Sequence, residues 1–178
     1  FILHRCISCH WKYMTPPEHI HVVRADYSDP LHSVALVDLL DTYARDPMGG
    51  GHPLSEHVRQ NLVATLAARS QAFSVLAFVH GMPAGLVNCI EGFSTFACAP
   101  LINVHDVVVR ECYRGQGVAR QMMAMVELIA RERGACKLTL EVLQGNTAAK
   151  QLYRGLGFAN YELDPAMGAA QFMQKWLP

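Results

Sequence analysis

A net charge and long apolar runs are both missing from this sequence, and each absence excludes a class of protein. Lys and Arg total 15 and so do Asp and Glu, so no charge excess attracts nucleic acid or an anionic membrane. No apolar run approaches the roughly 20 residues that a membrane-spanning helix needs. The 178 residues are 51% hydrophobic and 17% charged, a globular composition with enough length for one domain and its core.

A cysteine pattern typical of a disulfide framework is also missing. Four of the six cysteines lie singly in apolar or mixed segments: Cys89, Cys98, Cys112 and Cys136. Reduced thiols of this kind favour a cytoplasmic protein. Cys6, Cys9 and His10 match the C-x-x-C-H pattern of haem attachment or half of a zinc site, but no export signal precedes them and no second ligand pair is apparent. We expect no bound metal, a poorly ordered extension over residues 1–13, and a single domain over residues 14–178.

The hydrophobic periodicity predicts an α/β fold, a mixed sheet with helices packed on it. Strands are predicted at residues 21–27, 73–80, 84–95, 101–109, 137–143, 158–161 and 171–177. Helices are predicted to begin near Asp29, Ser55, Gly117 and Asn146, each followed by apolar residues at helical spacing. The strand, helix and strand between residues 101 and 143 should form a parallel crossover.

The strongest functional signal lies between residues 107 and 120. A valine-rich strand runs through a short loop into Gly115 and Gly117, and a long helix follows. Helix N-termini leave backbone N–H groups unpaired and glycine lets them approach a ligand, so this turn suits a pyrophosphate. A Walker A loop is excluded because no Gly-Lys-Ser/Thr follows, and the G-x-G-x-x-G of a Rossmann fold is incomplete. An ordinary tight loop before a helix stays open as an interpretation.

A second signal follows one strand later along the chain. Asn146 and Tyr153 are seven positions apart and therefore share one face of a helix, two turns from each other. Taken alone, Asn146 is explained as a helix N-cap and Tyr153 as a core aromatic with a tethered hydroxyl. Only the two signals together point to a function.

Together the two segments closely resemble the GNAT superfamily of acetyl-CoA-dependent N-acetyltransferases, in its small, single-domain bacterial form. The family's phosphate-binding pattern, Gln/Arg-x-x-Gly-x-Gly/Ala, appears here as Arg114-Gly115-Gln116-Gly117-Val118-Ala119. The family's later element, Asn-x-x-Ala-x-x-x-Tyr followed by Gly-Phe, appears as Asn146, Ala149, Tyr153 and Gly157-Phe158. The resemblance is sharp over residues 101–161 and topological over residues 21–100. It implies about six to seven mostly antiparallel strands around a central, splayed parallel pair, with about four helices.

The resemblance also implies which residues act. Contacts with acetyl-CoA are implied for Val107, Val108, Val109, Arg114, Gly115, Gln116, Gly117, Val118, Ala119, Arg120 and Asn146. The strand backbone pairs with the pantetheine arm, the amides of the glycine turn hold the pyrophosphate, and Asn146 contacts the arm. Tyr153 is implied as the general acid that protonates the departing thiolate. A neutral amine attacks the thioester directly, so no cysteine nucleophile is required.

The base that deprotonates the amine is left open between His105, Asp106 and Glu91. His105 has the intrinsic pKa best suited to the task. Strand alternation sends His105 and Asp106 to opposite faces, but a β-bulge, which members of the family often have here, would re-aim one of them. Some relatives that acetylate amino sugars carry an acidic pair at this place, where this sequence has His first.

The acceptor is expected to be a primary amine of an unidentified small molecule or peptide. Residues 43–53 and 91–99 should shape its site. The Gly49-Gly50-Gly51 run is interpreted as a mobile lid or a close-approach loop over the substrate, with a plain flexible connection as the alternative. A non-catalytic acyl-CoA-binding module, an enzyme for longer acyl chains and, more distantly, a nucleotide-binding oxidoreductase stay open as alternatives. No nucleic-acid or membrane partner is expected, and a homodimer is left open.

Overall fold

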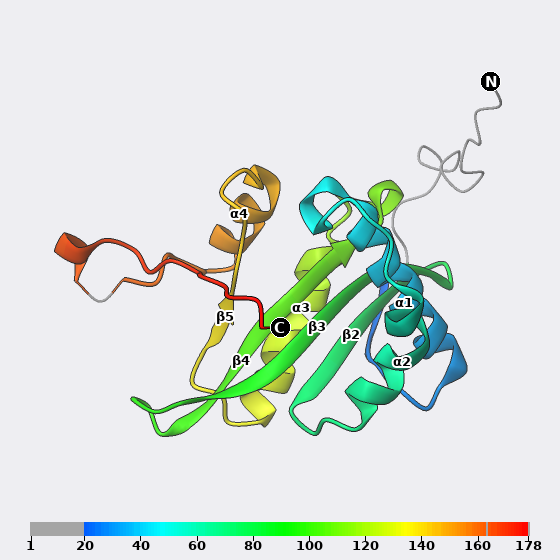
Figure 1. Cartoon of the computed structure of the whole chain (residues 1–178), viewed down its shortest axis with the longest axis horizontal. Coiled ribbons are helices and arrows are strands. Elements are labelled where there is room, and N and C mark those ends of the chain that lie inside the picture. Colours follow the sequence, from blue (N-terminus) through cyan, green and yellow to red (C-terminus); the bar gives the residue numbers. More distant parts are fainter. Residues whose placement is uncertain (1–19, 163, 178) are drawn as a thin grey trace. The chain divides into compact units, whose positions relative to one another are not determined.

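A computed structural model describes residues 20–162 and 164–177, so the Cys6-x-x-Cys9-His10 pattern lies outside the described residues. The chain divides into two compact units, one up to Leu140 and one from Glu141 onward. The first unit holds five strands: β1 (Ile20–Arg24), β2 (Ala72–Val79), β3 (Met82–Ser94), β4 (Ala99–Val109) and β5 (Leu138–Leu140) (Figure 1). Its helices are α1 (Pro30–Arg45), α2 (Glu56–Ala67) and α3 (Val118–Glu132), with short 3-10 turns η2 (Pro47–Gly49) and η3 (Glu111–Tyr113). The second unit holds α4 (Thr147–Arg154) and the turn η4 (Pro165–Met167).

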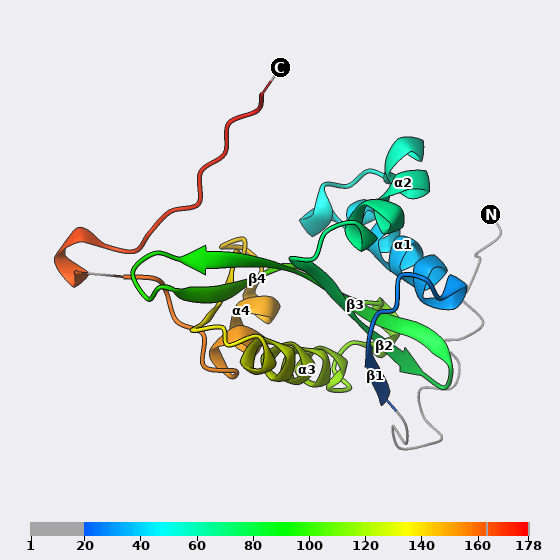
Figure 2. The same cartoon turned by 90° about the horizontal axis from the view of Figure 1, so that it is seen from below.

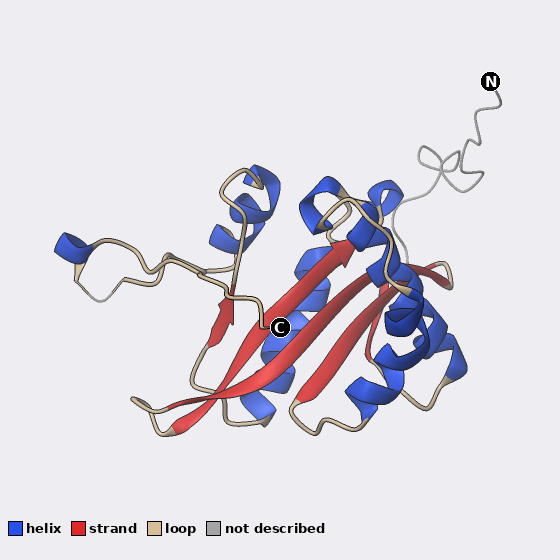
Figure 3. Ribbon diagram, viewed as in Figure 1, coloured by secondary structure: helices blue, strands red, loops and turns tan. Residues whose placement is uncertain are grey.

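The sheet is mixed, as the periodicity predicts. Its strand order is β1-β2-β3-β4-β5, with antiparallel neighbours throughout except the parallel pair β4 and β5 (Figure 3). Helix α3 connects this parallel pair, so the predicted strand-helix-strand crossover is confirmed. The hairpin between β2 and β3 turns through His80 (φ 50°) and Gly81 (φ 75°), two left-handed residues of the kind that tight hairpins require.

The two expected N-caps at α1 and α2 are present. The Asp29 carboxylate accepts a hydrogen bond from the Leu31 N–H at 2.7 Å, with Pro30 as the first helical residue. The Ser55 hydroxyl accepts from the Val58 N–H at 3.3 Å. Each side chain satisfies an N–H that the helix itself cannot pair, which sets where the helix begins.

Helices cover both faces of the sheet in the first unit. Figure 2 shows α1 and α2 on one face and α3 on the other. Helix α1 packs Leu36 and Leu39 against Leu76, Leu86 and Val108 of the sheet. Helix α3 buries the stripe Val118, Met122, Met123, Val126, Ile129 and Ala130. Burial on both faces explains why β2 and β3 are almost continuously apolar rather than alternating.

The expectation of six to seven strands is wrong at the C-terminal end. Within the described residues, the segments 158–161 and 171–177 contain no strand. The Phe158 N–H donates to the Tyr153 carbonyl at 2.9 Å and Gly157 has φ 89°, so this segment forms the capping turn of α4 instead. Residues 171–177 have exposed side chains, including Phe172 and Trp176. Apolar alternation favours a strand only where a hydrogen-bonding neighbour is available, and the predicted strand at 137–143 is likewise short, at Leu138–Leu140.

Candidate active site

The parallel pair that the resemblance implies is present, and its two strands pair over a short stretch. Strands β4 and β5 pair only at Ile102–Leu138, Asn103–Thr139 and Val104–Leu140. Beyond Val104, β4 runs on to Val109 paired with β3 alone, among the described residues. The other edge of residues 105–109 therefore presents backbone N–H and C=O groups that no sheet neighbour occupies.

That open edge leads directly into the glycine turn. After η3 the chain passes Gly115 (φ 75°) and Gly117 (φ 84°), and α3 begins at Val118. Both glycines have the left-handed conformation that other residues adopt only with strain. Gly117 is the N-cap residue and supplies no side-chain cap, so the first N–H groups of α3 are not satisfied by a capping side chain. The local structure fits a diphosphate group at this turn.

Arg114 links the glycine turn to the loop between α1 and α2. Its Nε donates to the Val109 carbonyl at 3.1 Å, and its Nη2 lies 3.2 Å from Asp46 Oδ2. The pKa of Asp46 lies below its usual range. The main cause is the hydrogen bond that its carboxylate accepts from the Met48 N–H at 2.9 Å, and the Arg114 guanidinium is a smaller cause. Gln116 braces the turn by donating to the Cys112 carbonyl at 2.9 Å.

The loop between α1 and α2 has a defined backbone at its glycine run. A Cβ on Gly49 would lie 2.0 Å from the Tyr43 carbonyl oxygen, so only glycine fits against the end of α1. Gly50 and Gly51 have φ of 115° and 77°. The Tyr43 hydroxyl donates to the Met48 carbonyl at 3.4 Å. The pKa of this phenol is raised, mainly by burial and to a smaller extent by the negative charge of Asp106. Gly49 is therefore in close approach to the end of α1, whereas Gly50 and Gly51 have open space where a Cβ would be.

The β-bulge expected near His105 is present. Asn88 pairs with Asp106 and the next residue, Cys89, pairs with Val104, so His105 is the extra residue on β4. Asp106 lies two positions before Val108, which belongs to the core cluster under α1, so alternation places Asp106 on the α1 face. His105 is exposed and Asp106 is half-buried.

Asp106 is the end of a chain of polar side chains that crosses the sheet. Asn88 Nδ2 donates to Asp106 Oδ2 at 3.0 Å, and Asn88 Oδ1 accepts from Ser74 Oγ at 2.6 Å. Ser74 Oγ lies 2.9 Å from the Tyr27 hydroxyl. Burial raises the pKa of the Tyr27 phenol. Sequence reasoning missed Asn88 and Ser74, although each is a lone polar residue in an otherwise apolar strand segment.

Glu91, the third candidate base, is engaged elsewhere. Its Oε2 accepts from Arg133 Nη1 at 2.8 Å, and Arg133 also lies over the Phe73 ring at 4.7 Å. This ion pair joins β3 to the end of α3 and is mostly shielded from solvent. Glu91 is an odd number of positions from Asn88, so alternation places it on the α3 face, away from Asp106. These contacts favour a bracing role for Glu91.

Cys89 follows Asn88 on β3, and its thiol is buried. It is 1% exposed, and burial raises its pKa to about 12. A thiol with that pKa stays protonated at neutral pH and is a poor nucleophile. The structure therefore offers Cys89 no role in forming a covalent intermediate.

Asn146 and Tyr153 belong to the second unit. Asn146 is the N-cap of α4, and its Oδ1 accepts from the Ala149 N–H at 3.1 Å. Tyr153 is buried two turns later and packs edge-to-face against Phe158, with ring centroids 5.9 Å apart. The explanations that the sequence offers for each residue alone, an N-cap and a core aromatic, are thus both observed. Their contacts with a co-substrate stay predictions.

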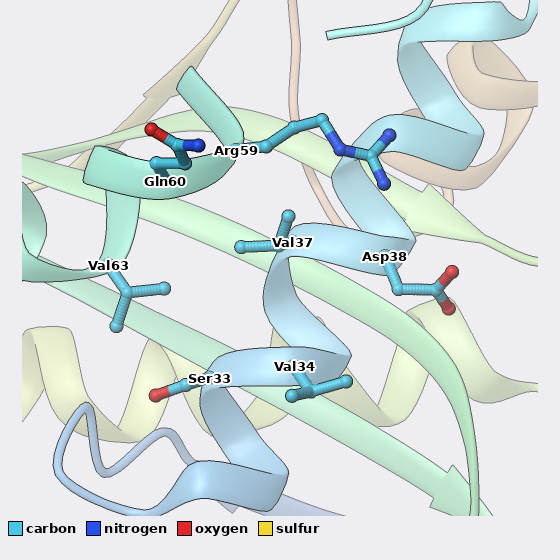
Figure 4. A pocket seen from close by; sticks show the side chains of 7 residues that line it. All are labelled: Ser33, Val34, Val37, Asp38, Arg59, Gln60 and Val63. Carbon is cyan, nitrogen blue, oxygen red and sulfur yellow. The ribbon is translucent and has the colours of Figure 1, made fainter. Parts of the chain in front are cut away.

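An open groove lies between α1 and α2, and none of the predicted site residues lines it. Its volume is about 520 Å³, and its lining is Ser33, Val34, Val37, Asp38, Arg59, Gln60 and Val63 (Figure 4). The two charged groups there have partners, since Asp38 pairs with Arg110 and Arg59 lies 3.2 Å from Asp41. Within the described ranges, no three His, Cys, Asp or Glu side chains are placed to share a metal ion. Over the same ranges, no helix has the length and apolarity needed to cross a membrane.

An open strand edge that runs into a glycine turn at a helix start is typical of proteins that bind a long, diphosphate-bearing co-substrate. Comparison with known proteins agrees with this class. The acetyltransferase (GNAT) family profile matches residues 35–158. The chain therefore belongs to the GNAT family of acetyltransferases, and membership implies acetyl-CoA as the co-substrate and an amine as the acceptor.

Individual relatives share parts of the chain. Streptothricin acetyltransferase from Streptomyces lavendulae is 41% identical over 66 residues, which is 37% of this chain and 35% of that protein. Thialysine N-epsilon-acetyltransferase from Bos taurus is 27% identical over 118 residues, 58% of this chain and 68% of that protein. Among solved structures, a ribosomal-protein-alanine N-acetyltransferase from Brucella melitensis biovar Abortus 2308 has the same fold, with a TM-score of 0.67 at 18% identity, covering 89% of this chain and all of that one. The match to the streptothricin enzyme thus spans about a third of its length.

Proposed function

We propose that this protein transfers the acetyl group of acetyl-CoA to a primary amine of a small molecule or peptide by direct attack. The observation that carries the proposal is the β4 edge over residues 105–109, which loses its neighbour β5 and runs straight into the glycine turn of α3. An extended backbone edge suits the amide-bearing pantetheine arm, and the N–H groups at the start of α3 suit the diphosphate.

The donor half of the site rests on backbone groups. Val107, Val108 and Val109 would pair with the pantetheine arm, and the amides from Gly115 to Arg120 would hold the diphosphate. Arg114 would add a positive charge beside it. A strand N–H near the bulge would polarise the thioester carbonyl, because a fixed donor stabilises the oxyanion that forms during attack.

Asp106 is the group that we assign to receive the amine's proton. A primary amine is mostly protonated at neutral pH and must lose a proton before it attacks. Asp38, Asp41 and Asp46 are each paired with arginine, whereas Asp106 forms no ion pair among the described residues. Its charge is therefore available to a cationic amine, either directly or through water. His105, whose side chain is exposed, is the alternative base.

The rest of the reaction follows from this assignment. The neutral nitrogen forms a bond to the acetyl carbon, the bond between that carbon and sulfur breaks, and the phenol of Tyr153 gives its proton to the departing thiolate. The nitrogen then loses its second proton as the amide forms, and that proton returns through solvent to the Tyr153 phenolate. The high pKa of Cys89 argues against this thiol as an acyl-accepting nucleophile. The names of two relatives, acetyltransferases of streptothricin and of thialysine, support a small-molecule amine as the acceptor.

The test is an acceptor screen. The full chain is incubated with acetyl-CoA and a panel of amines, and thiol release and acetylated product are both measured. The same screen on Tyr153→Phe and Asp106→Asn should show a lower kcat with binding of acetyl-CoA retained. Acetyl-CoA binding without turnover of any amine would instead favour a non-catalytic binding module, and turnover only with longer acyl-CoA would favour a different donor.

A further inference from the structure

The polar chain behind Asp106 has a direction that its chemistry fixes. An ionised carboxylate only accepts hydrogen bonds, so the group of Asn88 that faces Asp106 must be its NH₂, at 3.0 Å. The amide oxygen of Asn88 then faces Ser74, whose hydroxyl donates to it at 2.6 Å. That uses the only proton of Ser74, and the Tyr27 hydroxyl must therefore donate to Ser74 at 2.9 Å. Every donor in the chain points toward the carboxylate.

This row of hydrogen bonds holds one carboxylate oxygen of Asp106 and leaves the other without a partner among the described residues. Oδ2 accepts from Asn88, while Oδ1 accepts no hydrogen bond from the residues that the structure describes. Because His105 is an extra residue on β4, Asp106 pairs with Asn88 directly, which brings the two side chains together on one face. The carboxylate is thus fixed through one oxygen only.

A purely structural role does not account for this arrangement. Asn88 is 6% exposed and Ser74 is 0% exposed, and both lie within apolar strands. A buried hydrogen-bonded pair adds little net stability compared with apolar residues of the same size, because both groups give up water to form it. A local departure from an apolar pattern is expected at functional sites.

The geometry points to Asn88 as a positioning residue for acetyl transfer, holding Oδ2 of Asp106 so that Oδ1 is left for the acceptor amine. Ser74 and Tyr27 support it by keeping the Asn88 amide from turning over. This inference rests on the proposed function and adds a role for residues that do not themselves touch a substrate.

The experiment is a double-mutant cycle measured on kcat with the best amine from the screen. Asn88→Ala should lower kcat about 10- to 100-fold, because a base displaced by about 1 Å loses about that much. The KM for acetyl-CoA should stay within about twofold, since the donor half is untouched. In the Asp106→Asn background, Asn88→Ala should change kcat by less than about twofold, because the group that Asn88 positions is already disabled.

Two further variants keep the cycle decisive. Ser74→Ala removes the donor that orients the Asn88 amide without touching Asn88 itself, and it should show the same loss and the same non-additivity if Asn88→Ala fails to fold. Thr139→Val is the matched control, since it removes another hydroxyl that bonds an asparagine in this sheet, Asn103, at 3.3 Å. Its effect on kcat should be within about twofold and the same in both backgrounds.

The outcomes separate the two claims. If Asp106→Asn lowers kcat but Asn88→Ala lowers it equally in both backgrounds, Asn88 is merely structural and the positioning role is overturned while the proposed function stands. If Asp106→Asn leaves kcat unchanged, Asp106 is not the base and the positioning role falls with it. A wild-type protein that acetylates no amine overturns the proposed function itself.

Discussion

Replacing Asp46 with Asn should tighten the binding of acetyl-CoA, because it removes a competitor for Arg114. Arg114 stands at the start of the glycine turn, where the proposed site places the diphosphate, yet in the free protein its guanidinium lies 3.2 Å from Asp46 Oδ2. The anionic diphosphate must either share that guanidinium or displace the carboxylate. The Asn side chain retains an oxygen for the Met48 N–H, so the turn η2 should keep its cap.

The size of the effect follows from the exposure of the pair. The side chain of Arg114 is 58% exposed and that of Asp46 is 28% exposed, so the ion pair is worth about 0.2–1 kcal/mol. Since 1.4 kcal/mol corresponds to a factor of ten, the Kd of acetyl-CoA should fall by up to about fivefold. The gain should shrink as salt is added, because exposed charges are screened within about 8 Å at physiological ionic strength.

Calorimetric titration of acetyl-CoA into the wild type and Asp46→Asn at low and moderate salt measures this directly. Glu127→Gln is the matched control, since it removes an equally simple ion pair, with Arg131 on α3, without approaching the glycine turn. Its Kd should equal that of the wild type. An Asp46→Asn protein that binds acetyl-CoA no better than the wild type at low salt would show that Arg114 does not share its charge with the ligand.

Three other predictions concern the stability of the fold and the identity of the base. Gly85→Ala would place a Cβ 2.6 Å from Met122 Cε and 2.9 Å from the Val108 carbonyl oxygen, so the free energy of unfolding should fall by about 1–3 kcal/mol. Compared with Met122→Ala alone, the double variant should keep part of that loss, because the backbone contact with Val108 remains; chemical denaturation checks both. Arg45 and the Leu54 N–H hold the pKa of Asp41 below its usual range, so their stabilisation is present above about pH 4 and lost as the pH falls. Asp41→Asn should therefore lower the free energy of unfolding by about 1–2 kcal/mol at pH 7, with the difference vanishing at low pH. His105→Ala should leave the acidic limb of the pH–rate profile in place, whereas loss of that limb would transfer the base role from Asp106 to His105.

The elements set by nearby residues were the predictable ones. The caps at Asp29 and Ser55, the hairpin turn and the step from β4 through the glycine turn into α3 all depend on residues a few positions apart. Short-range geometry of this kind is written into the sequence pattern. The family resemblance likewise rests on two short segments, and the family comparison confirms it.

Features that join distant parts of the chain were not predictable. Tyr27, Ser74 and Asn88 come into line only because of the register of neighbouring strands, and one residue of slip would separate them. The contact between Asp46 and Arg114 spans 68 positions. The error at residues 158–161 and 171–177 has the related cause that a strand needs a partner, which its own sequence does not specify.

The single extra residue at His105 lies where two features of β4 meet. Val104 is the last position of β4 that pairs with β5, and the bulge begins at the very next residue. The same insertion also shifts the alternation, so that Asp106 turns toward α1 instead of continuing on the side of Val104. Deleting His105 would leave Val104 opposite Cys89 and Asp106 opposite Asn88, an unbroken ladder. A strand regularised in this way would keep Asp106 beside Asn88 and would lose only the bulge that adjoins the last residue paired with β5, so deleting His105 tests the opening for the donor while leaving the footing of the acceptor in place.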